Sequence, residues 1–202
     1  LSRFNAGETV CPDAFFYDLY AKSYAVYQET HGVVDVASAP LFDIWGFGFS
    51  KGELPDDKTV ASVMSMSGMS RLSPDLRSSA GEDGSLSADE IVLDGGKMPK
   101  LNFNAVAQGY SCDAIASYLY SIGVKDMLVD IGEFFCDGLN PSGKPWTIGI
   151  DRPIDGNNDV GAQLQGIFRA PAGPHGIVTS GNYRKFYVKD GKKYAHTIDP
   201  RT

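Results

Sequence analysis

Histidine and cysteine are scarce in this sequence, with three of each among its 202 residues. The three cysteines (Cys11, Cys112 and Cys136) form no CxxC pair, which argues against a zinc site. Their odd number argues against a framework built only from disulfides, so we interpret them as structural thiols. Long apolar runs are also missing, because no stretch approaches the roughly 20 residues of a membrane-spanning helix.

Basic residues are outnumbered as well. The chain carries 18 Lys and Arg against 25 Asp and Glu, for a formal net charge of −7 at neutral pH. This balance argues against nucleic acid as the main partner. The hydrophobic share of 43% and the charged share of 21% are ordinary for a globular protein. The length suffices for one domain, or at most two, with a sizeable core.

The apolar spacing predicts helices that alternate irregularly with strands. We expect helices over 13–31, 57–66 and 105–122, with Gly32 and Gly123 as stop signals and Asn104 as an N-cap. Strands are expected over 85–93, 100–103, 126–131, 146–150 and 165–170, with a strand entry after Val33 and a hairpin turn at Asp190-Gly191. The pattern predicts an α+β fold in which helices pack on a mixed or mostly antiparallel sheet.

Chemistry-bearing residues concentrate at the end of the chain. Its last seven residues are His196-Thr-Ile198-Asp199-Pro-Arg201-Thr. Histidine moves protons near neutral pH, and arginine binds phosphate with two parallel hydrogen bonds. Taken alone, His196 is interpreted equally well as a structural histidine. Because the chain stops inside this cluster, we expect it to be a piece of a longer protein.

A second candidate segment runs from Asn102 to Asp113, where a predicted strand meets a predicted helix. Small residues at Ala105, Ala107 and Gly109 allow a ligand to approach the backbone, and a helix N-terminus favours an anion. Close packing explains the same small residues. The polar turn at 179–183 likewise has an ordinary β-turn as its alternative.

Three segments, in this order, resemble motifs of the ApbE family, the FAD:protein FMN transferases. The stretch 33–41 with Trp45-Gly46-Phe47-Gly48 is similar to "FDIT-x-G-P-L…WGFG". The stretch 102–113 is similar to "D-x-G-A-I-A-K-G-Y-x-x-D", and the chain end to "H-x-I-D-P-x-T-G". Residues 129–132 and 179–181 fit between them. The resemblance covers essentially the whole chain and implies one T-fold-like domain over 1–202, truncated at both ends.

The resemblance implies an activity. The family transfers the FMN moiety of FAD to a threonine hydroxyl of a target protein, depends on Mg²⁺ and releases AMP. The implied partner is a threonine-containing acceptor subunit of a membrane electron-transport complex. The implied location is the periplasm, with attachment to the inner membrane through an N-terminal lipid. Two alternatives stay open: an FAD pyrophosphatase that yields FMN and AMP, and a flavin-binding protein without catalysis.

The resemblance also assigns roles to residues. It places His196 at the reacting phosphate, Ile198 against the ligand and the Ala105 carbonyl on Mg²⁺. The residues that it assigns to FAD contacts are Val33, Val34, Asp35, Asn102 and Gln108. Together they predict a single cleft, with the turn at Ala105 as its floor and the loop at His196 as one wall.

The sequence departs from the family pattern in charge and in extent. Asn102 replaces a common Asp, Gln108 replaces a common Lys or Glu, and Ala37 stands where Thr is frequent. The family's other Mg²⁺ ligands, an Asp and a Thr, lie beyond the histidine motif, and its "M-G-T" strand precedes the region matched here. Mg²⁺ prefers about six oxygen ligands. We therefore expect these 202 residues alone to bind FAD and Mg²⁺ poorly.

Overall fold

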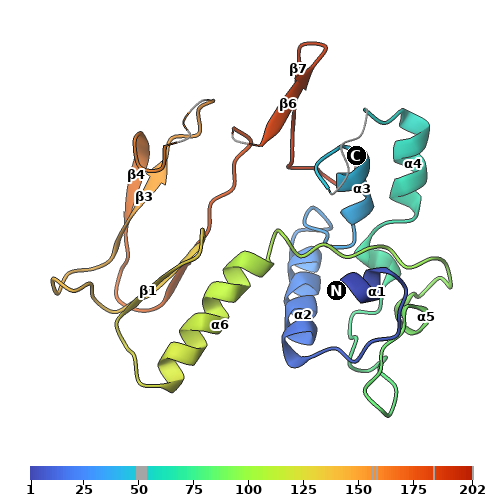
Figure 1. Cartoon of the computed structure of the whole chain (residues 1–202), viewed down its shortest axis with the longest axis horizontal. Coiled ribbons are helices and arrows are strands. Elements are labelled where there is room, and N and C mark those ends of the chain that lie inside the picture. The colour runs from blue at the N-terminus through green and yellow to red at the C-terminus, as the bar shows by residue number, and fades with distance from the viewer. Residues whose placement is uncertain (49–53, 156, 158, 184, 202) are drawn as a thin grey trace. The chain divides into compact units, whose positions relative to one another are not determined.

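The computed structural model describes residues 1–48, 54–155, 157, 159–183 and 185–201 (Figure 1). It divides the chain into two compact units. Unit 1 combines Leu1–Ala105 with Ile198–Thr202, and unit 2 is Val106–Thr197.

Unit 1 is built from helices and turns. Asp13 caps its longest helix by accepting a hydrogen bond from the Phe16 N–H, and Asp56 caps α4 by accepting one from the Thr59 N–H. Both helices confirm their predictions from sequence. The helices of unit 1 are α1 (Ser2–Asn5), α2 (Ala14–Glu29), α3 (Ala39–Ile44), α4 (Asp57–Ser65), α5 (Ala88–Ile91) and the 3₁₀ turn η1 (Met69–Arg71).

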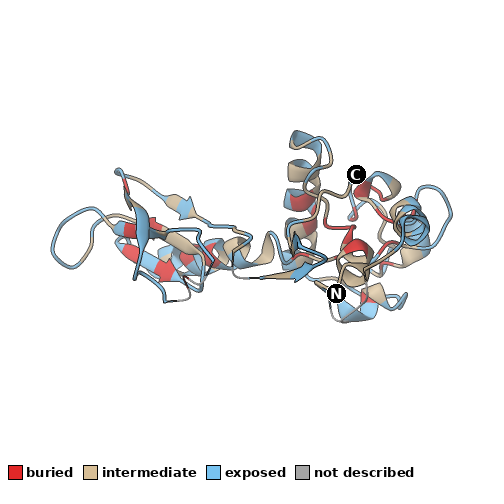
Figure 2. Cartoon of the chain, turned by 90° about the horizontal axis from the view of Figure 1, so that it is seen from above, coloured by how far each residue is buried: buried red, intermediate tan, exposed pale blue. Residues whose placement is uncertain are grey.

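The core of unit 1 gathers aromatic and aliphatic side chains around α2, where buried residues appear red in Figure 2. Tyr20 is 1% exposed, and its hydroxyl donates to the Ser73 carbonyl at 2.7 Å. The ring of Phe16 packs edge-on against those of Phe4 and Phe103. This burial of apolar surface holds the long loops of unit 1 onto α2.

Unit 2 places α6 (Ala107–Ser121) against a three-stranded antiparallel sheet. The strand order is β1-β2-β5, formed by β1 (Met127–Asp130), β2 (Phe134–Asp137) and β5 (His175–Ile177). Two further antiparallel pairs complete the unit, β3 (Thr147–Asp151) with β4 (Leu164–Arg169) and β6 (Phe186–Lys189) with β7 (Lys192–Ala195). The helices and antiparallel strands confirm the predicted α+β class.

The predicted hairpin turn between β6 and β7 is also confirmed. Asp190 and Gly191 adopt φ angles of 51° and 74°, the left-handed conformation that a two-residue hairpin of this kind requires. A local Asp-Gly signal was therefore sufficient to place this turn.

Three predicted strands are wrong. After Val33 the chain forms turns and then α3, which carries a proline in its first turn. Within 85–93, residues Ala88–Ile91 form α5, where the Glu90 carboxylate accepts from the Ser87 N–H and closes a capping box. Residues 100–103 form no strand, and the Asn5 side chain bonds both the N–H and the carbonyl of Leu101 at 2.8 Å.

The predicted cap of α6 is wrong as well. The helix begins at Ala107 with Val106 in the N-cap position, and no side chain caps it. Asn104 instead lies in the preceding turn, where its N–H donates to Asn102 Oδ1 at 2.9 Å. In the described part of the chain, no helix combines the length and the apolar character needed to cross a membrane. The sequence also predicts a loop over residues 51–55, of which 51–53 lie outside the described residues.

Candidate active site

The predicted nucleotide-contacting segment, Val33 to Asp35, follows directly after α2. The helix ends at Glu29, and His31 and Gly32 follow with left-handed φ angles of 52° and 83°. Val33 is 40% exposed, but its N–H donates to the Thr30 carbonyl and the Val34 N–H to the Thr30 hydroxyl, both at 3.2 Å, so the carbonyl oxygens of this turn are left for a ligand. The segment is thus a short, hydrogen-bonded turn rather than a strand.

The Asp35 carboxylate points into unit 1 and accepts backbone hydrogen bonds. Its Oδ1 accepts from the Ala37 N–H at 2.8 Å, and both oxygens lie 3.1–3.2 Å from the Met69 nitrogen. Burial raises the pKa of this carboxyl, and the hydrogen bonds from Met69 and Ala37 oppose that rise. The backbone hydrogen bonds therefore offset part of the cost of burying this charge.

Asn102 lies beside this segment although 67 positions separate it from Asp35. The Asn102 N–H donates to the Val36 carbonyl at 2.7 Å. Two motifs that are distant in the sequence therefore meet in unit 1. The Asn102 side chain accepts from Asn104 and so shapes the turn that leads to Ala105.

Ala105 is exposed and lies in the turn of residues 104–106. Among the described residues, no donor reaches its carbonyl oxygen. A carbonyl that accepts no hydrogen bond is available as an oxygen ligand to a cation such as Mg²⁺. It is a single ligand, and no group of three or more His, Cys, Asp or Glu residues in the described ranges is arranged to hold a metal ion.

The start of α6 gathers three of the segments named from the sequence. The Gln108 side-chain nitrogen donates to the Ile131 carbonyl at 2.8 Å, which ties the helix to the turn between β1 and β2. The Glu133 carboxylate accepts from the Thr179 N–H at 3.1 Å, which ties the same turn to the polar segment 179–181. These contacts lie wholly within unit 2. They leave the Gln108 carbonyl oxygen and the second N–H of its amide for a nucleotide.

His196 lies at the end of β7, and its ring is oriented by the backbone. Its Nδ1 lies 3.2 Å from the Lys185 carbonyl oxygen. A carbonyl only accepts hydrogen bonds, so this contact favours the tautomer with the proton on Nδ1. The lone pair of the neutral ring then lies on Nε2, which is the arrangement that a general base needs.

The residues after His196 return to unit 1 and form a compact turn. Arg201 bonds the Asp199 carboxylate through Nε at 2.9 Å and Nη2 at 2.8 Å, and lowers the pKa of Asp199 to about 2. The Arg201 side chain also passes 3.9 Å from the position that a Cβ would take on Gly32. The guanidinium is engaged with Asp199, and Ile198 enters the unit that holds Val33 and Asn102.

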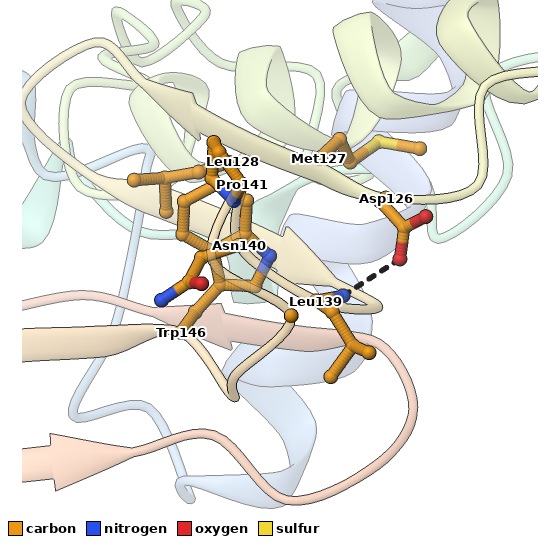
Figure 3. A pocket seen from close by; sticks show the side chains of 8 residues that line it. Asp126, Met127, Leu128, Leu139, Asn140, Pro141 and Trp146 are labelled. Carbon is orange, nitrogen blue, oxygen red and sulfur yellow. Dashed lines mark hydrogen bonds between the residues drawn. The ribbon is translucent and has the colours of Figure 1, made fainter.

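A surface pocket of about 460 Å³ lies elsewhere, between β1 and the turn that precedes β3 (Figure 3). Trp146 and Leu128 line it, and the Asp126 carboxylate accepts from the Leu139 N–H at its edge. None of the residues assigned to FAD or Mg²⁺ lines this pocket. Its position gives no support to a second nucleotide site.

The structure divides the predicted residues between the two units. Val33, Val34, Asp35, Asn102, Ala105 and Ile198 belong to unit 1, whereas Gln108 and His196 belong to unit 2. The cleft between the Ala105 turn and the His196 loop joins different units and stays a prediction. Sequence reasoning missed Met69, whose N–H donates to the Asp35 carboxylate 34 positions away, and Glu133, whose carboxylate accepts from the Thr179 N–H 46 positions away. No local pattern signals either contact.

The fold and these segments define the class of protein. The ApbE family matches residues 1–202, and the chain belongs to this family. The family resemblance of the three motifs is therefore confirmed.

Individual relatives are known by name. The chain is 30% identical over 208 residues to a FAD:protein FMN transferase of Klebsiella pneumoniae, with 100% of this chain and 55% of the relative covered. It is 32% identical over 178 residues to a FAD:protein FMN transferase of Vibrio cholerae, with 86% of this chain and 47% of the relative covered. The chain therefore spans about half the length of these relatives.

Solved structures of the family share the fold. The apo form of the Pseudomonas stutzeri flavinyl transferase ApbE superposes with a TM-score of 0.74 at 30% identity, covering 98% of this chain and 57% of that one. The flavin transferase ApbE of Vibrio cholerae gives the same TM-score and identity, with 100% and 60% covered.

Proposed function

We propose that the protein to which this chain belongs transfers the FMN moiety of FAD to a threonine hydroxyl of an acceptor protein and releases AMP. The observation that carries the proposal is the direct hydrogen bond between Asn102 and Val36. It joins two of the three family motifs within unit 1. The named relatives, which are FAD:protein FMN transferases, supply the reaction.

In this reaction the threonine oxygen attacks the FMN-side phosphorus of the diphosphate. A new P–O bond forms to threonine, the P–O bond to AMP breaks, and the hydroxyl proton goes to a base. We assign that role to His196 Nε2, since the Lys185 carbonyl favours the proton on Nδ1. General-base catalysis of this kind contributes roughly 10²–10⁴-fold.

The other assigned residues bind and orient FAD. Val33, Val34 and Asp35 would present their backbone to the nucleotide, and Asn102 would add its amide beside them. Ile198 would supply an apolar contact at the end of the same unit. Correct positioning of donor and acceptor supplies much of the rate in phosphoryl transfer, because little covalent chemistry falls to the protein.

Mg²⁺ belongs to the proposal as the required cation. When bound it would neutralise charge on the diphosphate as the AMP oxygen departs. The Ala105 carbonyl fits as one ligand, since no described donor reaches it. One carbonyl cannot hold Mg²⁺ tightly, so the remaining ligands would come from the phosphates, from water and from segments beyond these 202 residues.

The acceptor and the location rest on the family alone. We propose a threonine-bearing subunit of a membrane electron-transport complex as acceptor. We also propose the periplasmic side of the inner membrane, with attachment through an N-terminal lipid, as the place where the protein works.

Incubation of the full-length protein with FAD, Mg²⁺ and such an acceptor tests the function. We expect flavin fluorescence on the acceptor band in a denaturing gel, with one AMP released per flavin attached. Release of free FMN and AMP without a labelled acceptor identifies a pyrophosphatase, and bound FAD without turnover identifies a flavin-binding protein. Either result would overturn the proposal.

His196→Ala tests the assignment of the base, with His175→Gln as the matched control. His175 also lies in unit 2 and its Nε2 lies 3.2 Å from the Pro171 carbonyl, but no motif includes it. We expect a loss of roughly 10²-fold or more for His196→Ala and less than a twofold change for the control. An unchanged rate for His196→Ala removes the histidine from the mechanism.

A further inference from the structure

A turn at residues 68–69 forms hydrogen bonds to the segment that we propose contacts the nucleotide. The Met69 N–H donates to the Asp35 carboxylate, with nitrogen–oxygen distances of 3.1 and 3.2 Å. The adjacent Gly68 N–H donates to the Ala37 carbonyl at 3.2 Å. Two consecutive N–H groups of the turn thus donate to the segment 35–37, and we call this arrangement the Asp35–Gly68 clamp.

Gly68 is required by its backbone conformation. Its φ of 110° and ψ of 140° lie in a region that side chains other than glycine rarely adopt. A Cβ on Gly68 would stand 3.6 Å from Asp35 Oδ2, which is an ordinary contact. An alanine there would therefore act through backbone strain, which moves the Met69 N–H away from Asp35.

Arg71 connects this turn to the rest of unit 1. Its Nη1 donates to the Met66 carbonyl at 2.6 Å, and its Nε and Nη2 bond the Asp94 carboxylate at 2.6 and 3.0 Å. The Arg71 side chain is only 14% exposed. The residues on both sides of Gly68 are thus held in place, so the clamp has a rigid support.

The Asp35 carboxylate itself is poorly suited to touch FAD. Its two oxygens are occupied by the N–H groups of Ala37 and Met69. A free carboxylate beside a dinucleotide would also repel the diphosphate. By contrast, Val33 is 40% exposed. The N–H groups of Val33 and Val34 donate to Thr30, so their carbonyl oxygens are the backbone groups left for the nucleotide.

We propose that Asp35 and Gly68 are positioning residues. The clamp holds the backbone of Val33 and Val34 in the orientation that contacts the nucleotide, and the Asp35 carboxylate does not contact FAD. This inference rests on the proposed function. Asp35, which the motif predicts as a ligand contact, then supports the backbone that makes the contact. Gly68, 33 positions away, becomes a further determinant of FAD affinity.

The test uses the full-length enzyme and compares the variants Asp35→Asn and Gly68→Ala. The controls are Tyr20→Phe, which removes a hydrogen bond to Ser73 in the same unit, and Gly84→Ala, where φ is +75° and no atom lies within 4 Å of the added Cβ. Two quantities are measured for each: the dissociation constant for FAD, from quenching of flavin fluorescence, and the KM for FAD and kcat of transfer.

We expect both test variants to weaken FAD binding and raise the KM for FAD about tenfold, the effect of losing one hydrogen bond to a charged group. Their kcat at saturating FAD should stay within about threefold of the parent, because the variants disturb the backbone that binds the nucleotide but leave the reacting groups in place. The controls should lose stability without any change in KM. This split separates positioning from general destabilisation.

Other outcomes overturn the inference. If Asp35→Asn weakens binding but Gly68→Ala behaves like Gly84→Ala, the carboxylate itself contacts FAD. If all four variants shift KM equally, the clamp is merely structural. If Asp35→Asn does not fold, the comparison of Gly68→Ala with Gly84→Ala decides alone. A parent enzyme that neither binds FAD nor transfers flavin refutes the proposed function instead.

Discussion

Gly132 offers the sharpest test of the contacts at the start of α6. Its φ is +97°, and a Cβ placed there would stand 2.5 Å from the side-chain nitrogen of Gln108. Ordinary contacts between heavy atoms begin near 3.5 Å, so the Gln108 side chain must move away. Its 2.8 Å hydrogen bond to the Ile131 carbonyl is then lost.

The cost of Gly132→Ala follows from these two effects. A left-handed backbone at a residue other than glycine costs about 1–2 kcal/mol. Loss of the Gln108 hydrogen bond adds about 0.5–1 kcal/mol, since Gln108 is exposed and water replaces part of the bond. We therefore expect unit 2 to lose about 2 kcal/mol of stability.

A double-mutant cycle separates the two effects. In a Gln108→Ala background the clash is absent, so Gly132→Ala should cost only the backbone strain, and the coupling energy should be about 0.5–1 kcal/mol. Gly123→Ala is the matched control, because its φ is +88° and nothing lies within 4 Å of an added Cβ. It should cost about 1 kcal/mol in either background.

Urea denaturation followed through the indole N–H signal of Trp146 measures these energies. Unit 2 contains Trp146 and unit 1 contains Trp45, so each unit has its own reporter. Additive effects of Gly132→Ala and Gln108→Ala would refute the reasoning, because they would show that Gln108 does not occupy the space beside Gly132.

Two further predictions concern unit 1. Tyr20→Phe leaves the buried Ser73 carbonyl without its hydroxyl donor and should cost about 1–2 kcal/mol, measured through Trp45. The control Tyr118→Phe, at a 64% exposed residue of unit 2, should be neutral when measured through Trp146. Arg71 holds the pKa of Asp94 at about 2, below the ordinary 3.8, so this pair stabilises the fold above about pH 4 and that contribution is lost as the pH falls towards 2. Arg71→Gln should return the pKa of Asp94, followed by NMR titration, towards its ordinary value, and an unchanged pKa would contradict the ion pair.

Local signals in the sequence predicted much of the fold. Helix α2 was predictable because Asp13 caps it and the left-handed residues His31 and Gly32 follow its end, next to the same stretch of apolar spacing. The hairpin at Asp190-Gly191 was predictable because its left-handed turn depends on two adjacent residues. Such elements carry their own start and stop chemistry, so neighbouring residues suffice to identify them.

Elements that depend on distant partners were predicted wrongly or missed. The stretch after Val33 has β-branched residues typical of a strand, but the Asp35 side chain satisfies the N–H groups of Ala37 and Met69 and stabilises a turn. Helix α5 had a local signal, the Ser87-x-x-Glu90 capping box, which its alternating apolar pattern concealed.

In the candidate site too, local motifs were recognisable from the sequence, whereas contacts between distant residues were not. The motifs named its residues, and unit 1 confirms that the segments at Val36 and Asn102 are neighbours. No sequence signal pointed to Met69 or Glu133, because each binds a segment far along the chain through a backbone group. The candidate residues could therefore be named from the sequence motifs, but the groups that bond to them could not.

The most direct test of the account is an experimental structure of the full-length protein with FAD and Mg²⁺. We predict a single diphosphate with the Ala105 carbonyl on the metal, at the roughly 2.0–2.1 Å typical of Mg²⁺, and His196 Nε2 facing the FMN-side phosphate. A diphosphate that contacts neither residue, or Ala105 and His196 on opposite sides of the molecule, would contradict the central claim.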